Sequence, residues 1–271
     1  MTPSPRPPDD PSSSEPKVRL ERDGELGILT VADPPLNLFG QALLADLVTA
    51  LDHAAEVGDL RGLLVRADGE VFSGGADVHI FDGLGPDGAA AMRLTETVVH
   101  RLEALPYPTL GSVHGLCLTA GFELVLGCDM IWAAESARFG LVEAVVGVTP
   151  LMGGTQRVTE RAGPARAREL VMTGALYESA TLERWNVINR VLPDAELAEK
   201  SLRFARRLAA GPTRAHAGTK RVVRAYLDHG MARADETVAD VAANVADTDD
   251  FRGGVRTFLA EGPGKATFHG R

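Results

Sequence analysis

The segment HGLCLTAGFELVLGCDMIWAAESARFG, residues 114–140, carries the pattern that decides the fold. An apolar run ends at Leu118, and a helix can begin at Thr119 or Ala120. The stretches CDMIWAA and ARFGL follow this helix, and both are typical of short strands. A strand, a helix and two further strands in close succession predict an α/β fold with parallel or mixed sheets.

The alternation of strand and helix extends on both sides of this segment. Residues 18–32 repeat apolar positions around Asp23-Gly24, which predicts a β-hairpin with a tight turn. Strand signals fade from Gly163, so residues 163–260 are predicted to form successive helices. The other predicted elements are a helix over 41–57, a strand over 60–67, a helix over 88–105 and a strand over 107–117.

The chain divides by composition into three regions. The first 16 residues, MTPSPRPPDDPSSSEP, contain ten Pro or Ser and no Val, Ile or Leu, so they are predicted to form a disordered tail that cannot repay its ordering entropy. Residues 17–200 are predicted to form the α/β core with the functional site. Residues 201–271 are predicted to form a C-terminal helical region.

Composition and charge exclude several classes of protein. Of the 271 residues 45% are hydrophobic and 24% are charged, which is typical of a soluble globular chain. The net charge of -9 argues against nucleic acid as a partner, because phosphate binding requires a cationic field. Neither a signal peptide nor a membrane span is predicted, and the expected location is the cytoplasm. The cysteines, Cys117 and Cys128, lack ligand spacing, so no metal site is expected.

A glycine-rich string at residues 83–88 matches GxGxxG, and Glu103 lies 20 residues after its first glycine. This spacing raises the alternative of a dinucleotide site. The context does not fit, because Pro86 interrupts the turn and no strand-helix-strand unit begins at the N-terminus. A surface loop is the favoured interpretation of this string.

Two carboxylates stand in apolar surroundings, Glu123 in GFELV and Glu143 in LVEAV. Burying an unpaired carboxylate is costly, so each residue needs a partner or a function. Glu123 could be an acid near a helix start, where it favours the helix dipole. Glu143 could belong to a core salt bridge with Arg138 or Arg157. Catalysis is the alternative for both residues.

Three ordered segments resemble the crotonase superfamily, the enoyl-CoA hydratase and isomerase family. They are FSGGAD from residue 72, AGFEL from residue 120 with the CD and FG that follow it, and TPLMGGTQR from residue 149. The resemblance runs from about Val18 to the C-terminal end. It implies a spiral of ββα turns, a C-terminal helical part used in trimerisation, and a trimer or dimer of trimers. It also implies an acyl-CoA thioester as substrate.

The resemblance assigns roles to particular residues. The N–H groups of Ala76 and Ala120 would form an oxyanion hole for the thioester oxygen, Glu123 would activate a water, and Glu143 would protonate the α-carbon. The residues implied in substrate or CoA binding are Ser73, Gly74, Asp77, Val78, Leu151 and, from a neighbouring subunit, Phe258.

The function implied is reversible hydration of a trans-2-enoyl-CoA to a 3-hydroxyacyl-CoA, with no cofactor beyond the CoA of the substrate. Double-bond isomerisation, and a catalytically silent acyl-CoA binding protein, remain as alternatives.

The sequence also departs from the family pattern. Thr119-Ala120-Gly121 replaces a Gly-Gly-Gly run, and Leu151 and Met152 replace small residues beside the expected acyl chain. Pro35 and Glu261 stand where basic residues near CoA are expected.

Overall fold

The computed structural model describes residues 16–81 and 88–271. Apart from Pro16 and Gly88, the predicted N-terminal tail and the glycine-rich string at 83–88 therefore lie outside the described residues. Between residues 81 and 97, side-chain burial is described only for Thr95 and Thr97.

The predicted hairpin is confirmed. Strands β1 (Val18–Asp23) and β2 (Leu26–Val31) pair antiparallel, and Gly24 at φ +63° makes the turn between them. Every residue of β2 is buried, because this strand continues into a sheet. Strands β3 (Gly62–Ala67), β4 (Thr109–Val113), β6 (Met130–Ala134) and β9 (Arg190–Leu192) complete it in the order β1-β2-β3-β4-β6-β9, parallel from β2 onward.

The single strand predicted over 107–117 is wrong, because the structure has two strands there in different sheets. Strand β5 (Leu116–Leu118) leaves the large sheet and pairs with β7 (Arg138–Gly140), which pairs with β8 (Tyr177–Glu178). Gly115 makes the change of direction at φ +58°, and a Cβ there would lie 2.2 Å from the Glu70 carbonyl oxygen. Only glycine fits such a close backbone approach.

The prediction that residues 163–260 form helices alone is also wrong. The short strands β8 and β9 interrupt that region, and β9 pairs with β6 at the edge of the large sheet. Strands of two or three residues are too short to show a period in sequence, and their hydrogen-bond partners lie far away along the chain.

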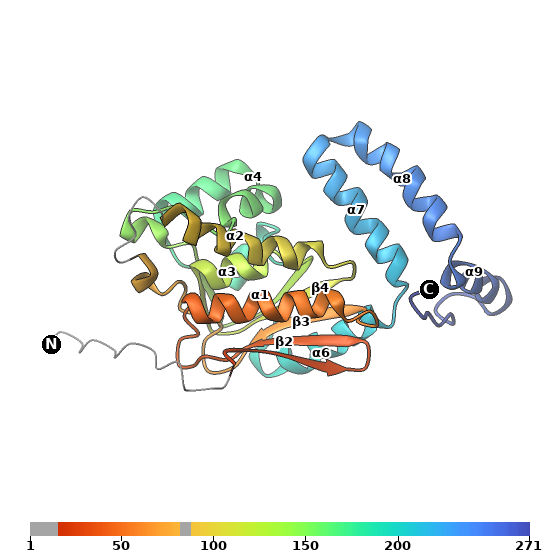
Figure 1. Cartoon of the computed structure of the whole chain (residues 1–271), viewed down its shortest axis with the longest axis horizontal. Helices are drawn as coiled ribbons and strands as arrows, with labels where there is room; N and C mark the ends of the chain where they lie inside the picture. The colour runs from red at the N-terminus through yellow and green to blue at the C-terminus, as the bar shows by residue number, and fades with distance from the viewer. Residues whose placement is uncertain (1–15, 82–87) are drawn as a thin grey trace.

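The helices cover the large sheet from both sides (Figure 1). Helix α1 (Gln41–Glu56) lies over β2 and β3, and α6 (Asp194–Ala209) packs on the opposite face. Helices α2 (Gly88–Ala104) and α3 (Thr119–Leu126) stack beyond α1, with α4 (Gly154–Thr173) beside them and the short α5 (Ser179–Arg184) near β9. Every residue of α3 is buried. This burial makes α3 the central element of the layer above the sheet.

The C-terminal helices extend away from the body (Figure 1). Helices α7 (Thr213–His229) and α8 (Met231–Ala246) pack against each other, and α9 (Asp249–Glu261) follows. In the part of the chain that the structure describes, no helix is long and apolar enough to cross a membrane.

The start of α3 lies directly against the loop that follows β3. Gly121 makes this contact possible, because a Cβ at that position would be 2.4 Å from the Cβ of Ser73. Two isolated bridges, Phe39 with Ala76 and Ser73 with Cys117, hold the same loop against its neighbours. The relative position of α3 and this loop is therefore fixed by close packing that leaves no room for an added methyl group.

We expect Gly121→Ala to lower the free energy of unfolding by about 1–3 kcal/mol, as overpacking does in a filled core. Gly253→Ala is the matched control, because it lies inside α9 with no atom within 4 Å of the added Cβ. Alanine there should be neutral or stabilising by up to about 1 kcal/mol. Denaturant unfolding of both variants measures the difference, and equal stabilities would show that α3 and the loop are not tightly packed.

Candidate active site

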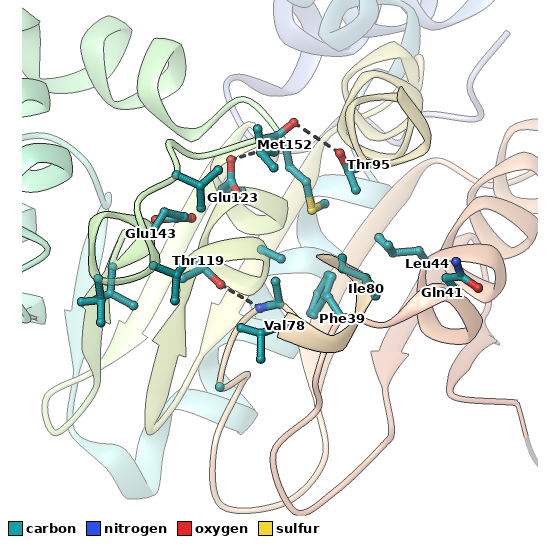
Figure 2. Close-up of a pocket in the computed structure, with 18 of the residues that line it drawn as sticks. Phe39, Gln41, Leu44, Val78, Ile80, Thr95, Thr119, Glu123, Glu143 and Met152 are labelled. Atoms are coloured by element: carbon teal, nitrogen blue, oxygen red, sulfur yellow. Dashed lines mark hydrogen bonds between the residues drawn. The ribbon is translucent and has the colours of Figure 1, made fainter. Parts of the chain in front are cut away.

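A cavity of about 510 Å³ opens where the loop after β3, the start of α3 and the chain before α4 meet (Figure 2). Most of the residues singled out from the sequence line this cavity. Figure 2 shows Glu123 and Glu143 at one end and Leu44 of α1 at the other. The predicted residues in the lining are Gly74, Ala76, Val78, Ala120, Glu123, Glu143 and Leu151.

Ser73 and Asp77 support the cavity from outside its lining. The Ser73 hydroxyl donates to the Asn37 carbonyl at 2.8 Å and accepts from the Gly75 N–H at 2.9 Å. Asp77 Oδ1 accepts from the His79 N–H at 3.0 Å, at the start of the short 3-10 helix Val78–Phe81. In this single chain both side chains shape the loop.

Phe258 lies far from the cavity, on α9. Its ring is 58% exposed and lines a separate groove with Phe251 and Phe268. Within one chain it does not join the other predicted residues, so its expected contact with CoA requires a second subunit.

The Glu123 carboxylate is held by a backbone turn. The side chain is 2% exposed, and Oε1 accepts hydrogen bonds from the N–H groups of Met152 and Gly154, both at 2.8 Å. Burial raises the pKa of Glu123 to about 7, against the opposing effect of these N–H groups and of the nearby Arg157 charge. Both donors belong to a segment about 30 residues further along the chain, and α3 has no acid in its first turn. The alternative that Glu123 is an acid at a helix start is therefore wrong.

Arg157 fixes the turn that holds Glu123. Its guanidinium makes two hydrogen bonds to the Glu103 carboxylate, at 2.7 and 2.6 Å, and a third to the Gly153 carbonyl at 3.1 Å. A bidentate pair of this kind has a defined orientation. Glu103, whose spacing from the glycine-rich string had raised the alternative of a dinucleotide site, is therefore the anchor of Arg157.

Glu143 has no partner among the described residues. It begins the 3-10 helix Glu143–Val146, is 9% exposed, and both of its buried oxygens lack a hydrogen bond. The alternative of a core salt bridge is wrong, because Arg138 pairs with Glu178 and Arg157 with Glu103. Burial, and then the negative charge of Glu123, raise the pKa of Glu143 to about 7.

Two residues of the cavity lining, Ala76 and Ala120, carry backbone N–H groups that have no partner in a regular helix or strand ladder. Phe39 bonds to the carbonyl of Gly75 and the N–H of Asp77, so the N–H of Ala76 between them points to the other side. There it donates to Thr119 Oγ1 at 2.8 Å. Ala120 is the second residue of α3, and an N–H at that position has no acceptor within its helix. The positive end of the helix dipole lies at the same place.

The rest of the cavity wall is apolar, and sequence reasoning missed most of it. Phe39 lies just before α1 and Leu44 in its first turn. Ile80 comes from the 3-10 helix after the loop, and Val145 and Val146 come from the 3-10 helix after β7. Val145 is 80% exposed and Val146 60%. A pair of valines in a short glycine-bounded segment is the signal that marks this wall in the sequence.

Across residues 16–81 and 88–271, no group of three His, Cys, Asp or Glu side chains could hold a metal ion.

Comparison with known proteins places the chain in a family. The family model for enoyl-CoA hydratase/isomerase matches residues 21–270. The protein named "Probable enoyl-CoA hydratase" in Rhizobium meliloti is 32% identical over 247 residues, which cover 89% of this chain and 94% of the relative. One with the same name in Bacillus subtilis is 30% identical, covering 71% of this chain and 76% of the relative.

Solved structures agree with the sequence relatives. An enoyl-CoA hydratase subunit from Geobacillus kaustophilus superposes with a TM-score of 0.88 at 30% identity, covering 94% of this chain and 98% of that one. An enoyl-CoA hydratase from Bacillus anthracis superposes with a TM-score of 0.88 at 25% identity, covering 94% of this chain and 100% of that one. The chain belongs to the enoyl-CoA hydratase/isomerase family and has the crotonase fold.

Proposed function

We propose that the protein is an enoyl-CoA hydratase that adds water reversibly to a trans-2-enoyl-CoA. The observation that carries this proposal is the pair of buried carboxyl groups, Glu123 and Glu143, lining one cavity with pKa values near 7. Hydration needs one group that accepts a proton from water and one that delivers a proton to carbon. A pair of carboxyls that shares one proton at neutral pH supplies both.

The surroundings of the two carboxyls support a division of roles. Glu123 accepts two N–H bonds and lies in the field of Arg157, both of which favour the ionised form. Glu143 has no donor and lies near Glu123, so the neutral acid is favoured there. We therefore assign the shared proton to Glu143 and the role of base to Glu123.

The proposed reaction adds one water across the double bond of the enoyl group. Glu123 takes a proton from a water, and the water oxygen bonds to the β-carbon of the enoyl group. As that bond forms, the π electrons of the conjugated system shift toward the thioester oxygen, where hydrogen-bond donors at the start of α3 stabilise the enolate. Glu143 gives its proton to the α-carbon as the enolate collapses. No electrons are gained or lost overall, so the chemistry requires no cofactor other than the CoA carried by the substrate.

The apolar end of the cavity supports an acyl chain as the bound group. Phe39, Leu44 and Ile80 provide hydrocarbon contact there, and Leu151 and Met152 add bulk beside the carboxyls. The acidic chain carries little general attraction for the anionic CoA, so affinity has to come from these local contacts.

We expect Glu123→Gln and Glu143→Gln each to lower the hydration rate of crotonyl-CoA by about 10²- to 10⁴-fold, because glutamine keeps the shape but cannot exchange the proton. The double variant should lose little more, since both groups act on one water. Loss of the conjugated thioester absorbance measures the rate. If Glu143→Gln alone abolishes conversion of a 3-enoyl-CoA while Glu123→Gln is tolerated, the enzyme is an isomerase. A wild-type protein inert with both substrates would support the silent acyl-CoA binding protein.

We expect kcat/KM to depend on pH as a bell with its maximum near neutrality. At low pH both carboxyls are protonated and Glu123 cannot act as base; at high pH both are ionised and Glu143 has no proton to give. Glu143→Gln should remove the alkaline limb from the residual rate. A rate independent of pH between about 5 and 9 would contradict this proton sharing.

We also propose that the chain forms a trimer or a dimer of trimers through its C-terminal helices. Large apolar side chains are exposed along α7, α8 and α9, and such patches mark interaction surfaces. This surface would bring Phe258 to the CoA of a neighbouring subunit, as the family resemblance implies. The exposed residues are Val223, Tyr226, Leu227, Met231, Val238, Phe251, Val255 and Leu259.

We expect sedimentation at micromolar protein to give three or six times the 28.7 kDa mass of one chain. Replacing Tyr226 with Asp should weaken the assembly, because a charge would have to be buried in the interface. A monomeric wild-type protein would refute the assembly and the cross-subunit role of Phe258.

A further inference from the structure

The hydroxyl of Thr119 occupies the place where a substrate oxygen would meet Ala76. Thr119 Oγ1 lies 2.8 Å from the Ala76 nitrogen and accepts its N–H, as the dashed line beside Thr119 in Figure 2 shows. The N–H carries one hydrogen. A thioester oxygen therefore cannot receive its full hydrogen bond while Oγ1 stays in place.

The hydroxyl fits into a space that Gly75 leaves open. A Cβ at Gly75 would lie 2.1 Å from Thr119 Oγ1 and 3.2 Å from Thr119 Cβ, and Gly75 itself has a φ of +105°. Thr119 is 8% exposed. The threonine side chain and the Gly75 backbone are thus packed against each other, and the hydroxyl position is part of the built site.

The backbone of Thr119 is strained in a way that needs a reason. Its φ is +41°, in the left-handed region that β-branched residues avoid. Glycine adopts this conformation at little cost, whereas a side chain with a Cβ costs about 1–2 kcal/mol. Strain of this kind collects at functional sites, where the surrounding structure holds it. The hydroxyl is the one polar group that threonine adds at this position.

The hydrogen of that hydroxyl is available for a ligand. Thr119 Oγ1 accepts from Ala76, and within the described residues no acceptor receives its own O–H. The hydroxyl belongs to the first residue of α3, and the next residue is Ala120, whose N–H has no acceptor within the helix. An oxygen placed at the start of α3 can therefore receive both the O–H of Thr119 and the N–H of Ala120.

We propose that the Thr119 O–H is a direct hydrogen-bond donor of the oxyanion hole, in place of the Ala76 N–H. This inference rests on the proposed hydratase function. The enolate oxygen receives the Thr119 O–H and the Ala120 N–H, while the Ala76 N–H polarises the hydroxyl from behind. Chains of this kind strengthen each hydrogen bond. No proton is transferred from Thr119, and all three donors are satisfied in the complex.

The alternative is that substrate displaces the hydroxyl from Ala76. Displacement breaks the bond from Ala76 and moves the hydroxyl out of the space over Gly75, in a residue that is already strained. In the proposed arrangement, which we call the relay, Ala76 N–H donates to the Thr119 hydroxyl and that hydroxyl donates to the substrate. The relay keeps the bond from Ala76 and adds an acceptor for the unused hydrogen. The contacts of the free site therefore favour the relay.

Two substitutions at Thr119 separate these cases. Thr119→Val keeps the β-branch and the size but removes the hydroxyl, and Thr119→Ser keeps the hydroxyl. With crotonyl-CoA, the relay predicts that valine lowers kcat by about 10²- to 10³-fold with a smaller change in KM, the range for loss of one oxyanion donor. Serine should stay within a few-fold of wild type. Displacement predicts that valine leaves kcat unchanged or raises it, and this result would overturn the proposal.

A binding measurement provides a readout that does not depend on turnover. 4-Dimethylaminocinnamoyl-CoA absorbs at longer wavelength when its carbonyl oxygen receives stronger hydrogen bonds, so the shift on binding reports the donors directly. Wild type and Thr119→Ser should give a large red shift, and Thr119→Val a much smaller one. Thr119→Ala repeats the test should the valine variant fail to fold, which thermal unfolding shows. An equal shift in wild type and in the folded variant without the hydroxyl would overturn the relay.

The two proposals can fail separately. A wild-type protein that does not hydrate crotonyl-CoA but gives a red shift lost in Thr119→Val refutes the hydratase function and supports the hydroxyl donor. A wild-type protein that hydrates crotonyl-CoA, with an unchanged rate and shift in Thr119→Val, supports the hydratase function and refutes the donor.

Discussion

The close approach of the start of α3 to the loop after β3 is the constraint on which the site depends. Gly121 has no side chain because the Cβ of Ser73 fills that space, and Gly75 has none because Thr119 lies over it. Two glycines on two different elements thus let the two backbones come within hydrogen-bond reach. The N–H of Ala76 and the start of α3 would otherwise face separate regions. This packing turns a loop and a helix end into one polar corner of an apolar cavity.

The two carboxyl groups lie beside this polar corner, and hydrogen bonds and an ion pair hold one of them in place. Glu123 is bound to the N–H groups of Met152 and Gly154, and Arg157 holds that turn through Glu103. Glu143 has no such support and stays buried without a partner among the described residues. An unpaired buried carboxyl lowers stability, and burial raises its pKa to about 7, so that part of it is protonated at neutral pH. The protein therefore carries one supported and one unsupported carboxyl, which suits a base beside an acid.

The cavity has a polar end and an apolar end because its walls come from different layers. The polar groups lie on α3, on the loop after β3 and on the 3-10 helix after β7. Phe39 lies just before α1 and Leu44 in its first turn (Figure 2), and α1 belongs to the layer on the large sheet. A substrate with a reactive thioester and a hydrocarbon chain matches this division. The proposed chemistry and the proposed acyl specificity thus rest on separate parts of the fold.

Local sequence determined the elements whose pattern lies within a single segment. The hairpin around Asp23-Gly24, the helix from Gln41 and the helix that begins at Thr119 were all predicted, because their apolar spacing and turn residues are neighbours in the chain. The family resemblance, carried by motif residues, indicated the part of the cavity around the two carboxyls but not most of its apolar wall. Only the tertiary structure decided the split at Gly115 and the pairing of β9 with β6, since both depend on backbone hydrogen bonds between distant segments. It also decided that Arg157 pairs with Glu103 and that Thr119 faces Ala76. Ion pairs and side-chain hydrogen bonds form between whichever groups the fold brings within about 3 Å, and the order of residues along the chain does not encode that distance.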